Sequence, residues 1–189
     1  MLMNILIGLV VVLAVLAVAI VTRPATFRVE RSTTVSAPAD VPFGYVNDFH
    51  LWSEWSPWEK LDPNLKRTFS GAPSGAGAVY SWAGNSKAGE GRMAITESAP
   101  NQRIAIDLQF LKPFKARNLT EFMFKPSADG VGVTWAMSGE NTFVTKAFSL
   151  FMSMDKMVGK DFEQGLANLK TVAETAVKRR SKGGGSASA

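Results

Sequence analysis

An unbroken apolar segment opens the chain: within the first 21 residues, only Asn4 and Gly8 are not hydrophobic. As a helix, residues 2–22 would extend for about 31 Å at ~1.5 Å per residue, enough to cross the ~30 Å hydrocarbon core of a bilayer. The pattern therefore predicts a transmembrane anchor over residues 1–23. A cleaved signal peptide is the alternative. Ala17-Val18-Ala19 would serve as its cleavage site, although no basic residue precedes the apolar segment.

The basic residues around this segment predict its orientation. Arg23, Arg28 and Arg31 follow it, and no Lys or Arg precedes it. Basic residues are retained on the cytoplasmic side of membrane spans. We therefore expect a single-pass membrane protein whose domain lies on the cytoplasmic side.

Residues 26–37 predict a first strand, because apolar and β-branched residues alternate with polar ones along the segment. Pro38-Ala39-Asp40 then predicts the start of a helix. The apolar face of this helix would carry Val41, Tyr45, Val46 and Phe49. A second short helix is expected over residues 51–55.

Further strands are predicted in the middle of the chain, where short apolar segments alternate with turn residues. These strands are expected at residues 79–83, 91–97, 103–110, 117–124 and 131–139. The turns between them are Pro100-Asn101, Lys112-Pro113 and Asp129-Gly130. The pattern predicts five or six antiparallel strands after the small helices.

The period changes after Asn141, where apolar residues recur every three or four positions, as on one face of a long helix. This apolar stripe consists of Phe151, Met154, Val158, Phe162, Gly165, Leu169, Val172 and Ala176. Gly159 and Gly165 each cost ~1 kcal/mol relative to Ala inside a helix. We expect them where the helix approaches a sheet closely.

This order of elements predicts an α+β fold in which a curved antiparallel sheet wraps around one long C-terminal helix. One helix does not fill such a sheet, so a cavity is expected between them. The domain is predicted over residues 26–178. Residues 179–189 are expected to form a basic and then Gly/Ser/Ala-rich flexible tail.

Composition excludes several classes of function. The chain has no cysteine and a single histidine, so thiolate chemistry, disulfides and a histidine-rich metal centre are excluded, and no cofactor is expected. The net charge of +5 comes largely from Lys178, Arg179, Arg180 and Lys182. No aromatic residues interleave this basic segment, so nucleic-acid binding is not expected. A helix end in solvent and contact with anionic lipid remain as explanations.

Several motifs together resemble one superfamily over residues 27–178. They include Val29-Glu30-Arg31-Ser32, Trp52-Ser53-Glu54-Trp55-Ser56-Pro57-Trp58, Gly75-Ala76-Gly77, Tyr80-Ser81-Trp82, Gly89-Glu90-Gly91-Arg92-Met93 and Gly159-Lys160-Asp161-Phe162-Glu163. The sequence is similar to the START-like helix-grip superfamily, in its SRPBCC or polyketide cyclase/dehydrase branch. The resemblance implies a cavity for a hydrophobic ligand. It does not imply one reaction, since members include binding proteins, lipid carriers and cyclases.

The candidate ligand-binding residues are aromatic, Met and Leu side chains predicted to face inward. They are Trp55, Trp58, Tyr80, Trp82, Met93, Leu108, Phe110, Phe122, Trp135, Met137, Phe151 and Met154. Alternation along the strands places several of them on one face. Trp52, Trp55 and Trp58 follow at spacings of three, which suits either a core plug or an aromatic rim beside the cavity.

Three functions are consistent with these features. We expect a membrane-anchored module that binds a hydrophobic small molecule or lipid, with the membrane as partner and the oligomeric state open. A cyclase or dehydratase is the first alternative, using His50 or an inward-facing carboxylate for proton transfer. The carboxylates considered are Glu90, Glu97, Glu121 and Glu140. An interaction protein with a membrane partner is the second alternative.

Overall fold

The computed structural model describes residues 1–150 and 152–184. The helices are α1 (Leu2–Val21), α2 (Asp40–Asn47), α3 (Trp52–Trp55), α4 (Phe143–Phe148) and α5 (Met154–Gly184), with 3₁₀ helices η1 (Phe49–Leu51) and η2 (Pro57–Lys60). The strands are β1 (Thr26–Val35), β2 (Lys66–Gly71), β3 (Ala78–Ala83), β4 (Glu90–Ala99), β5 (Arg103–Lys112), β6 (Ala116–Ser127) and β7 (Gly130–Glu140).

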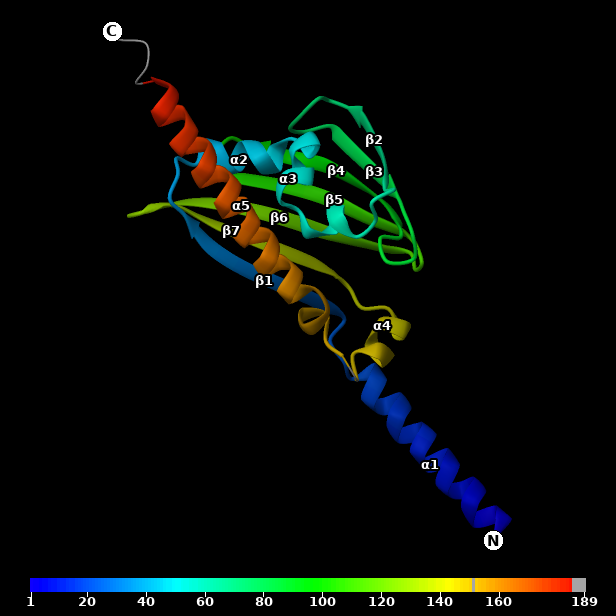
Figure 1. Cartoon of the computed structure of the whole chain (residues 1–189). Helices are drawn as coiled ribbons and strands as arrows, with labels where there is room; N and C mark the ends of the chain where they lie inside the picture. The colour runs from blue at the N-terminus through cyan, green and yellow to red at the C-terminus, as the bar shows by residue number, and fades with distance from the viewer. Residues whose placement is uncertain (151, 185–189) are drawn as a thin grey trace.

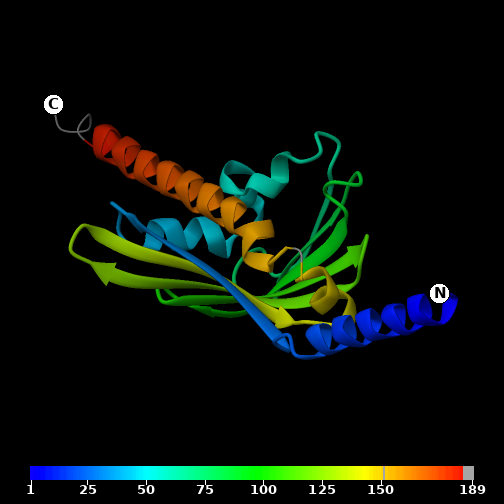
Figure 2. The ribbon, with the colours of Figure 1, turned by 90° about the horizontal axis from the view of Figure 1, so that it is seen from below.

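The seven strands form one curved antiparallel sheet in the order β1-β7-β6-β5-β4-β3-β2. α5 lies across one face of this sheet together with α2 and α3, and α1 projects from the end of the domain (Figures 1 and 2). We call the face under α5 the helix-covered face and the opposite one the outer face. The predicted α+β class, with a curved sheet around a long C-terminal helix, is confirmed.

Strand β2 was not assigned from the sequence, although its presence agrees with the expected number of strands. All six of its residues are exposed, and it pairs only with β3 at the edge of the sheet. An edge strand exposed along its length carries no burial alternation, so its sequence lacks the pattern by which strands are recognised.

A stack of aromatic rings fills the space between the centre of the sheet and α5. The Trp135 ring lies parallel to that of Phe162 on α5 at 4.2 Å, and also stacks on Phe122 at 4.8 Å. A Cβ atom at Gly165 would lie 2.7 Å from Cζ3 of Trp135. The close approach expected of this glycine is therefore observed, since any side chain there would collide with the indole ring.

Helix α5 is held along β1 by polar contacts as well as by the core. Arg31 forms ion pairs with Asp155 at 2.8 Å and Glu163 at 2.7 Å, and Lys170 donates a hydrogen bond to the carbonyl of Thr34.

Helix α5 continues to Gly184. Residues 179–184 are therefore helical, where a flexible tail was expected; residues 185–189 lie outside the described residues.

The pairing register shows which segments gather at the end of the sheet from which α1 extends. Thr26 at the start of β1 pairs with Glu140 at the end of β7, and Phe110 on β5 pairs with Ala116 on β6. The β3–β4 loop (84–89) and the β5–β6 turn (113–115) therefore lie at this end, and α4 follows β7 there. We call this the α1 end of the sheet.

Candidate ligand-binding site

On the helix-covered face, paired residues of neighbouring strands form rows that run across the sheet. The side chains in these rows become less buried toward the α1 end. Trp135 pairs with Phe122 in a central row, and both are buried. Two rows closer to the α1 end, Leu108 pairs with Met93. The last row joins Phe110, Gly91 and Trp82, and its two aromatic residues are half-buried.

Five of the candidate ligand-binding residues are half-buried: Trp58, Trp82, Leu108, Phe110 and Met154. All except Phe110 pack against the core, and Phe110 contacts Trp82. The five residues come from η2, β3, β5 and the start of α5. These side chains retain contact with solvent although they are apolar, so an apolar ligand that covered them would remove apolar surface from water.

Gly91 allows the indole ring of Trp82 to lie across the sheet. A Cβ atom at this position would collide with Cζ2 and Cη2 of Trp82. The indole Nε1 donates to the carbonyl of Ala88 at 3.0 Å, and the ring meets Phe110 edge-on with centroids 5.9 Å apart. Side chains from β3 and β5 therefore meet above β4, because Gly91 contributes no side chain between them.

Six other candidates lie in the packed interior. Trp55, Tyr80, Met93, Phe122, Trp135 and Met137 are all buried. Trp52 is buried with them, and the indole groups of Trp52 and Trp55 donate to the carbonyls of Val46 and Tyr45. Two members of the tryptophan cluster, Trp52 and Trp55, therefore belong to the core, and the third, Trp58, is half-buried. Phe151 lies outside the described residues.

Two buried polar atoms in this region lack a hydrogen-bond partner among the described residues. They are Oγ1 of Thr120 and Nε1 of Trp135, on side chains that are only 3% and 2% exposed. Thr120 pairs with Met137 and is a diagonal neighbour of Trp135 on the same face. Native structures pair nearly all such groups, so a hydrogen-bonding group that reached these two atoms would be stabilised there.

A partly buried polar network lies farther along the sheet, where β3 meets η2. The Tyr80 hydroxyl donates to Oε1 of Glu59 at 2.6 Å, while Nε of Arg67 donates to Oε2 of the same carboxylate at 2.6 Å. Burial and, second, the bond to the Glu59 carboxylate raise the pKa of Tyr80 well above its ordinary value. Tyr80 therefore remains protonated, and both oxygens of Glu59 are engaged.

Three polar residues in the interior, Glu59, Asn118 and Thr120, were not predicted from the sequence. Asn118 and Thr120 alternate in phase with Phe122 and Phe124, so the spacing along β6 was a signal that would have placed them on the helix-covered face. No pattern distinguishes Glu59 from an ordinary exposed carboxylate in a short helix.

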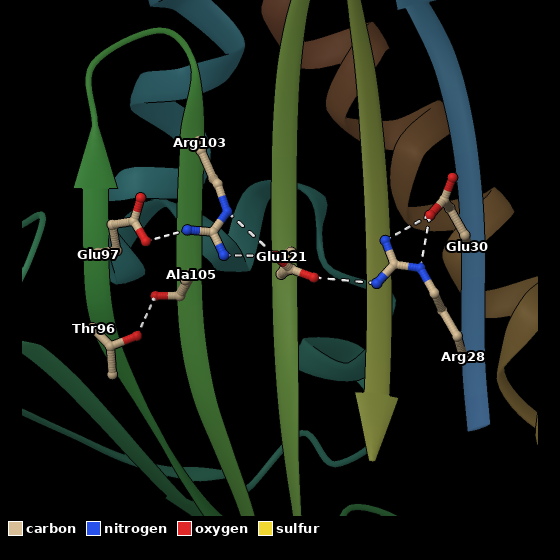
Figure 3. Close-up of polar contacts among 7 residues, drawn as sticks. All are labelled: Arg28, Glu30, Thr96, Glu97, Arg103, Ala105 and Glu121. Carbon is tan, nitrogen blue, oxygen red and sulfur yellow. Dashed lines mark hydrogen bonds and ion pairs between the residues drawn. The ribbon is translucent and has the colours of Figure 1, made fainter. Parts of the chain in front are cut away.

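The carboxylates proposed for catalysis lie elsewhere. Glu97 and Glu121 take part in an ion network on the outer face, where Arg103 bridges them and Arg28 links Glu121 to Glu30 (Figure 3). Hydrogen bonds from Arg103 and Arg28 lower the pKa of Glu121. These side chains point away from the helices, so the expectation of an inward-facing catalytic carboxylate is not met by them.

The remaining catalytic candidates are also outside the half-buried apolar region. Glu90 pairs with Lys112 at 2.9 Å, and Glu140 is exposed at the end of β7. His50 is half-exposed, lies 2.8 Å from Oδ1 of Asp48 and stacks on Phe69 beside the edge strand. Its neighbourhood is that of a surface residue at the edge of the sheet.

Two surface hollows flank α5. One is lined by residues that include Tyr45, Glu54 and Val172, and the other by residues that include Arg31 and Lys170. Neither is lined by any of the twelve candidate ligand-binding residues. The strongest candidate site is therefore the half-buried apolar region at the α1 end.

Comparison with known proteins agrees with this architecture. Residues 26–174 match the family described as "Polyketide cyclase / dehydrase and lipid transport". The chain belongs to this family. The match begins at β1 and ends within α5, so it includes the whole sheet and leaves α1 outside. A search of curated proteins finds no significant match.

Solved structures share the fold at low sequence identity. Protein CV1439 from Chromobacterium violaceum is 15% identical, with a TM-score of 0.55 over 80% of this chain and 99% of its own. The di-domain ARO/CYC protein BexL, from the BE-7585A biosynthetic pathway, is 16% identical, with a TM-score of 0.59 over 84% of this chain and 53% of BexL. Protein SA2116 from Staphylococcus aureus, of unknown function, is 11% identical with a TM-score of 0.58, over 81% and 96%.

Helix α1 projects from the folded domain and contacts it at α4. It is the one helix of the described residues that is long and apolar enough to cross a membrane, and none of it is buried in the protein. A membrane anchor and a signal sequence share these properties.

Proposed function

We propose that this protein is a membrane-anchored module that binds a hydrophobic small molecule or lipid. The ligand would lie on the helix-covered face at the α1 end of the sheet. The observation that carries this proposal is the half-buried apolar group formed by Trp58, Trp82, Leu108, Phe110 and Met154. Burial of such side chains by an apolar ligand is favourable at about 25 cal/mol per Å².

Two further features support binding. Oγ1 of Thr120 and Nε1 of Trp135 have no hydrogen-bond partner among the described residues. A ligand that also carries a carbonyl or hydroxyl group and extends to them would supply one. The family is described by polyketide cyclisation, dehydration and lipid transport, activities whose substrates are largely hydrophobic. α1 would act as the anchor, and the basic residues that follow it favour a domain on the cytoplasmic side.

An apolar fluorescent probe tests this proposal with the full chain in detergent-free nanodiscs. Met154→Trp should fill the region and reduce probe affinity at least tenfold while the protein stays folded. Met157→Trp is the matched control, because Met157 lies on the same helix but is 49% exposed. Equal affinity of both variants and the wild type would refute this site. Native mass spectrometry of the purified protein would identify a bound lipid directly.

A cyclase or dehydratase is the second candidate, and the buried Glu59–Tyr80 pair is the observation in its favour. This pair would supply the proton transfer that such reactions require. The engagement of both Glu59 oxygens, one of them by Arg67, favours a structural role instead. If the protein is an enzyme acting through this pair, Tyr80→Phe should abolish turnover of a polyketide substrate while probe binding is retained.

A further inference from the structure

Three phenylalanine side chains are exposed to an unusual degree. Outside α1, the three most exposed large hydrophobic residues among those described are Phe114 at 78%, Phe148 at 64% and Phe143 at 63%. Isolated exposed hydrophobic residues are common on protein surfaces, whereas a group of them marks an interaction site. The three phenylalanines would therefore indicate an interaction site only if they lie close together.

All three lie at the α1 end of the sheet, although they come from two separate segments. Phe114 occupies the β5–β6 turn, which the register places at this end. Phe143 and Phe148 delimit α4, which follows β7 and lies next to the end of α1 (Figures 1 and 2). If α1 crosses a bilayer, the bilayer surface would therefore lie close to α4.

The charges of this end complement an anionic surface. Arg23, Lys87, Lys112, Lys115 and Lys146 all belong to segments at the α1 end. Glu90 and Glu140 are the opposing carboxylates in these segments, and Glu90 is paired with Lys112. Lys115 and Lys146 flank the exposed phenylalanines and form no ion pair among the described residues.

We propose that the β5–β6 turn and α4 form a docking surface for the lipid bilayer, distinct from the anchor. The phenylalanines would enter the interface while Lys115 and Lys146 contact anionic headgroups, as in interfacial segments of peripheral membrane proteins. Docking would hold two members of the half-buried apolar group, Trp82 and Phe110, toward the membrane. A ligand would then pass between bilayer and protein without crossing water. This inference rests on the proposed anchoring by α1.

Single cysteine labels test this surface, because the natural chain contains no cysteine. Ala116→Cys places an environment-sensitive fluorophore beside Phe114 at the start of β6. Ala128→Cys is the matched control, since it is also an exposed alanine but lies just beyond the opposite end of the same strand. The full chain would be reconstituted in vesicles of phosphatidylcholine alone or with phosphatidylserine. Quenching by lipid-attached nitroxide would then be measured.

We expect the label at position 116 to be quenched by the lipid nitroxide and the label at 128 to remain in water. Phe114→Ser should lower the ratio of docked to undocked protein roughly tenfold or more. Lys115→Glu should lower it at least about fivefold, and only in vesicles that contain phosphatidylserine.

Two outcomes would overturn the inference, and they are distinguishable. If the protein floats with the vesicles but the label at 116 reports water in both lipid compositions, α1 anchors the chain and the docking surface is wrong. If the protein does not float, the anchoring on which docking rests fails as well.

Discussion

Removal of the Phe162 ring would test the role assigned to the aromatic stack. This side chain is 2% exposed, lies parallel to Trp135 at 4.2 Å and meets Trp58 edge-on at 6.0 Å. Phe162→Ala removes a buried aromatic ring and leaves a cavity, which costs about 3–5 kcal/mol in comparable cores. The ring contacts are included in that range, since aromatic pairs contribute roughly 0.5–1.5 kcal/mol beyond area burial.

The free energy of unfolding can be measured by urea denaturation of the full chain in mild detergent, followed by tryptophan fluorescence. The free energy of unfolding of domains of this size is about 5–15 kcal/mol. The variant should therefore remain folded in the absence of denaturant unless the free energy of unfolding of the wild type is near the lower end of this range. Phe148→Ala is the matched control, because the same atoms are removed from a side chain that is 64% exposed. We expect it to change stability by less than about 0.5 kcal/mol. Equal effects of the two variants would refute the burial and stacking on which the α5 packing argument depends.

Three further predictions concern the site, the outer face and the anchor. Gly91→Val should displace the Trp82 ring and lower probe affinity, and it should also destabilise the fold, because the added Cβ atom would lie 2.7 Å from the carbonyl oxygen of Gln109. Unchanged probe affinity in the folded variant would exclude this surface from the site. Glu121 has a lowered pKa in the folded state, so its ion pairs contribute stability that is fully present above the unfolded pKa of about 4.3 and is lost as pH falls through the folded pKa. Glu121→Gln should therefore destabilise the protein by about 1 kcal/mol at pH 7 in urea titrations, and the difference from wild type should shrink at acidic pH; a constant difference would contradict this role. An impermeant thiol reagent should label Ala128→Cys only after cells are lysed, and the intact mass should retain residues 1–23; labelling of intact cells or loss of the segment would reject the cytoplasmic anchor.

Most of the fold follows from patterns that arise directly from burial. Trp135 and Met137 alternate with outward residues along β7, and the 3.6-residue period around Phe162 predicted the face of α5 that packs on the sheet. β2 and α4 have no such pattern. β2 is exposed along its whole length, while the phenylalanines at the two ends of α4 point to solvent instead of the core.

The site was harder to predict, because alternation shows which face a side chain occupies but not how deeply it is covered. Tyr80 and Trp82 share a face and are two residues apart, yet Tyr80 is buried and Trp82 is half-buried. The difference arises from the small helices: Phe49 in η1 packs on Tyr80, and Glu59 in η2 hydrogen-bonds its hydroxyl. Such coverage depends on tertiary contacts that no local pattern encodes.

The position of the half-buried apolar group is best explained together with the two ends of the sheet. Away from α1, the helices α2 and α3 and the aromatic stack cover the helix-covered face, so apolar side chains there are satisfied by the protein itself. At the α1 end, Trp82 and Phe110 are incompletely covered, and Phe114 at the adjacent turn is exposed. Exposure of apolar surface costs free energy in water, and that cost disappears where a bilayer or an apolar ligand takes the place of water. The same end also carries α1, which we propose as the membrane anchor. The incomplete coverage therefore coincides with the end of the domain that the proposed anchor would hold against a bilayer.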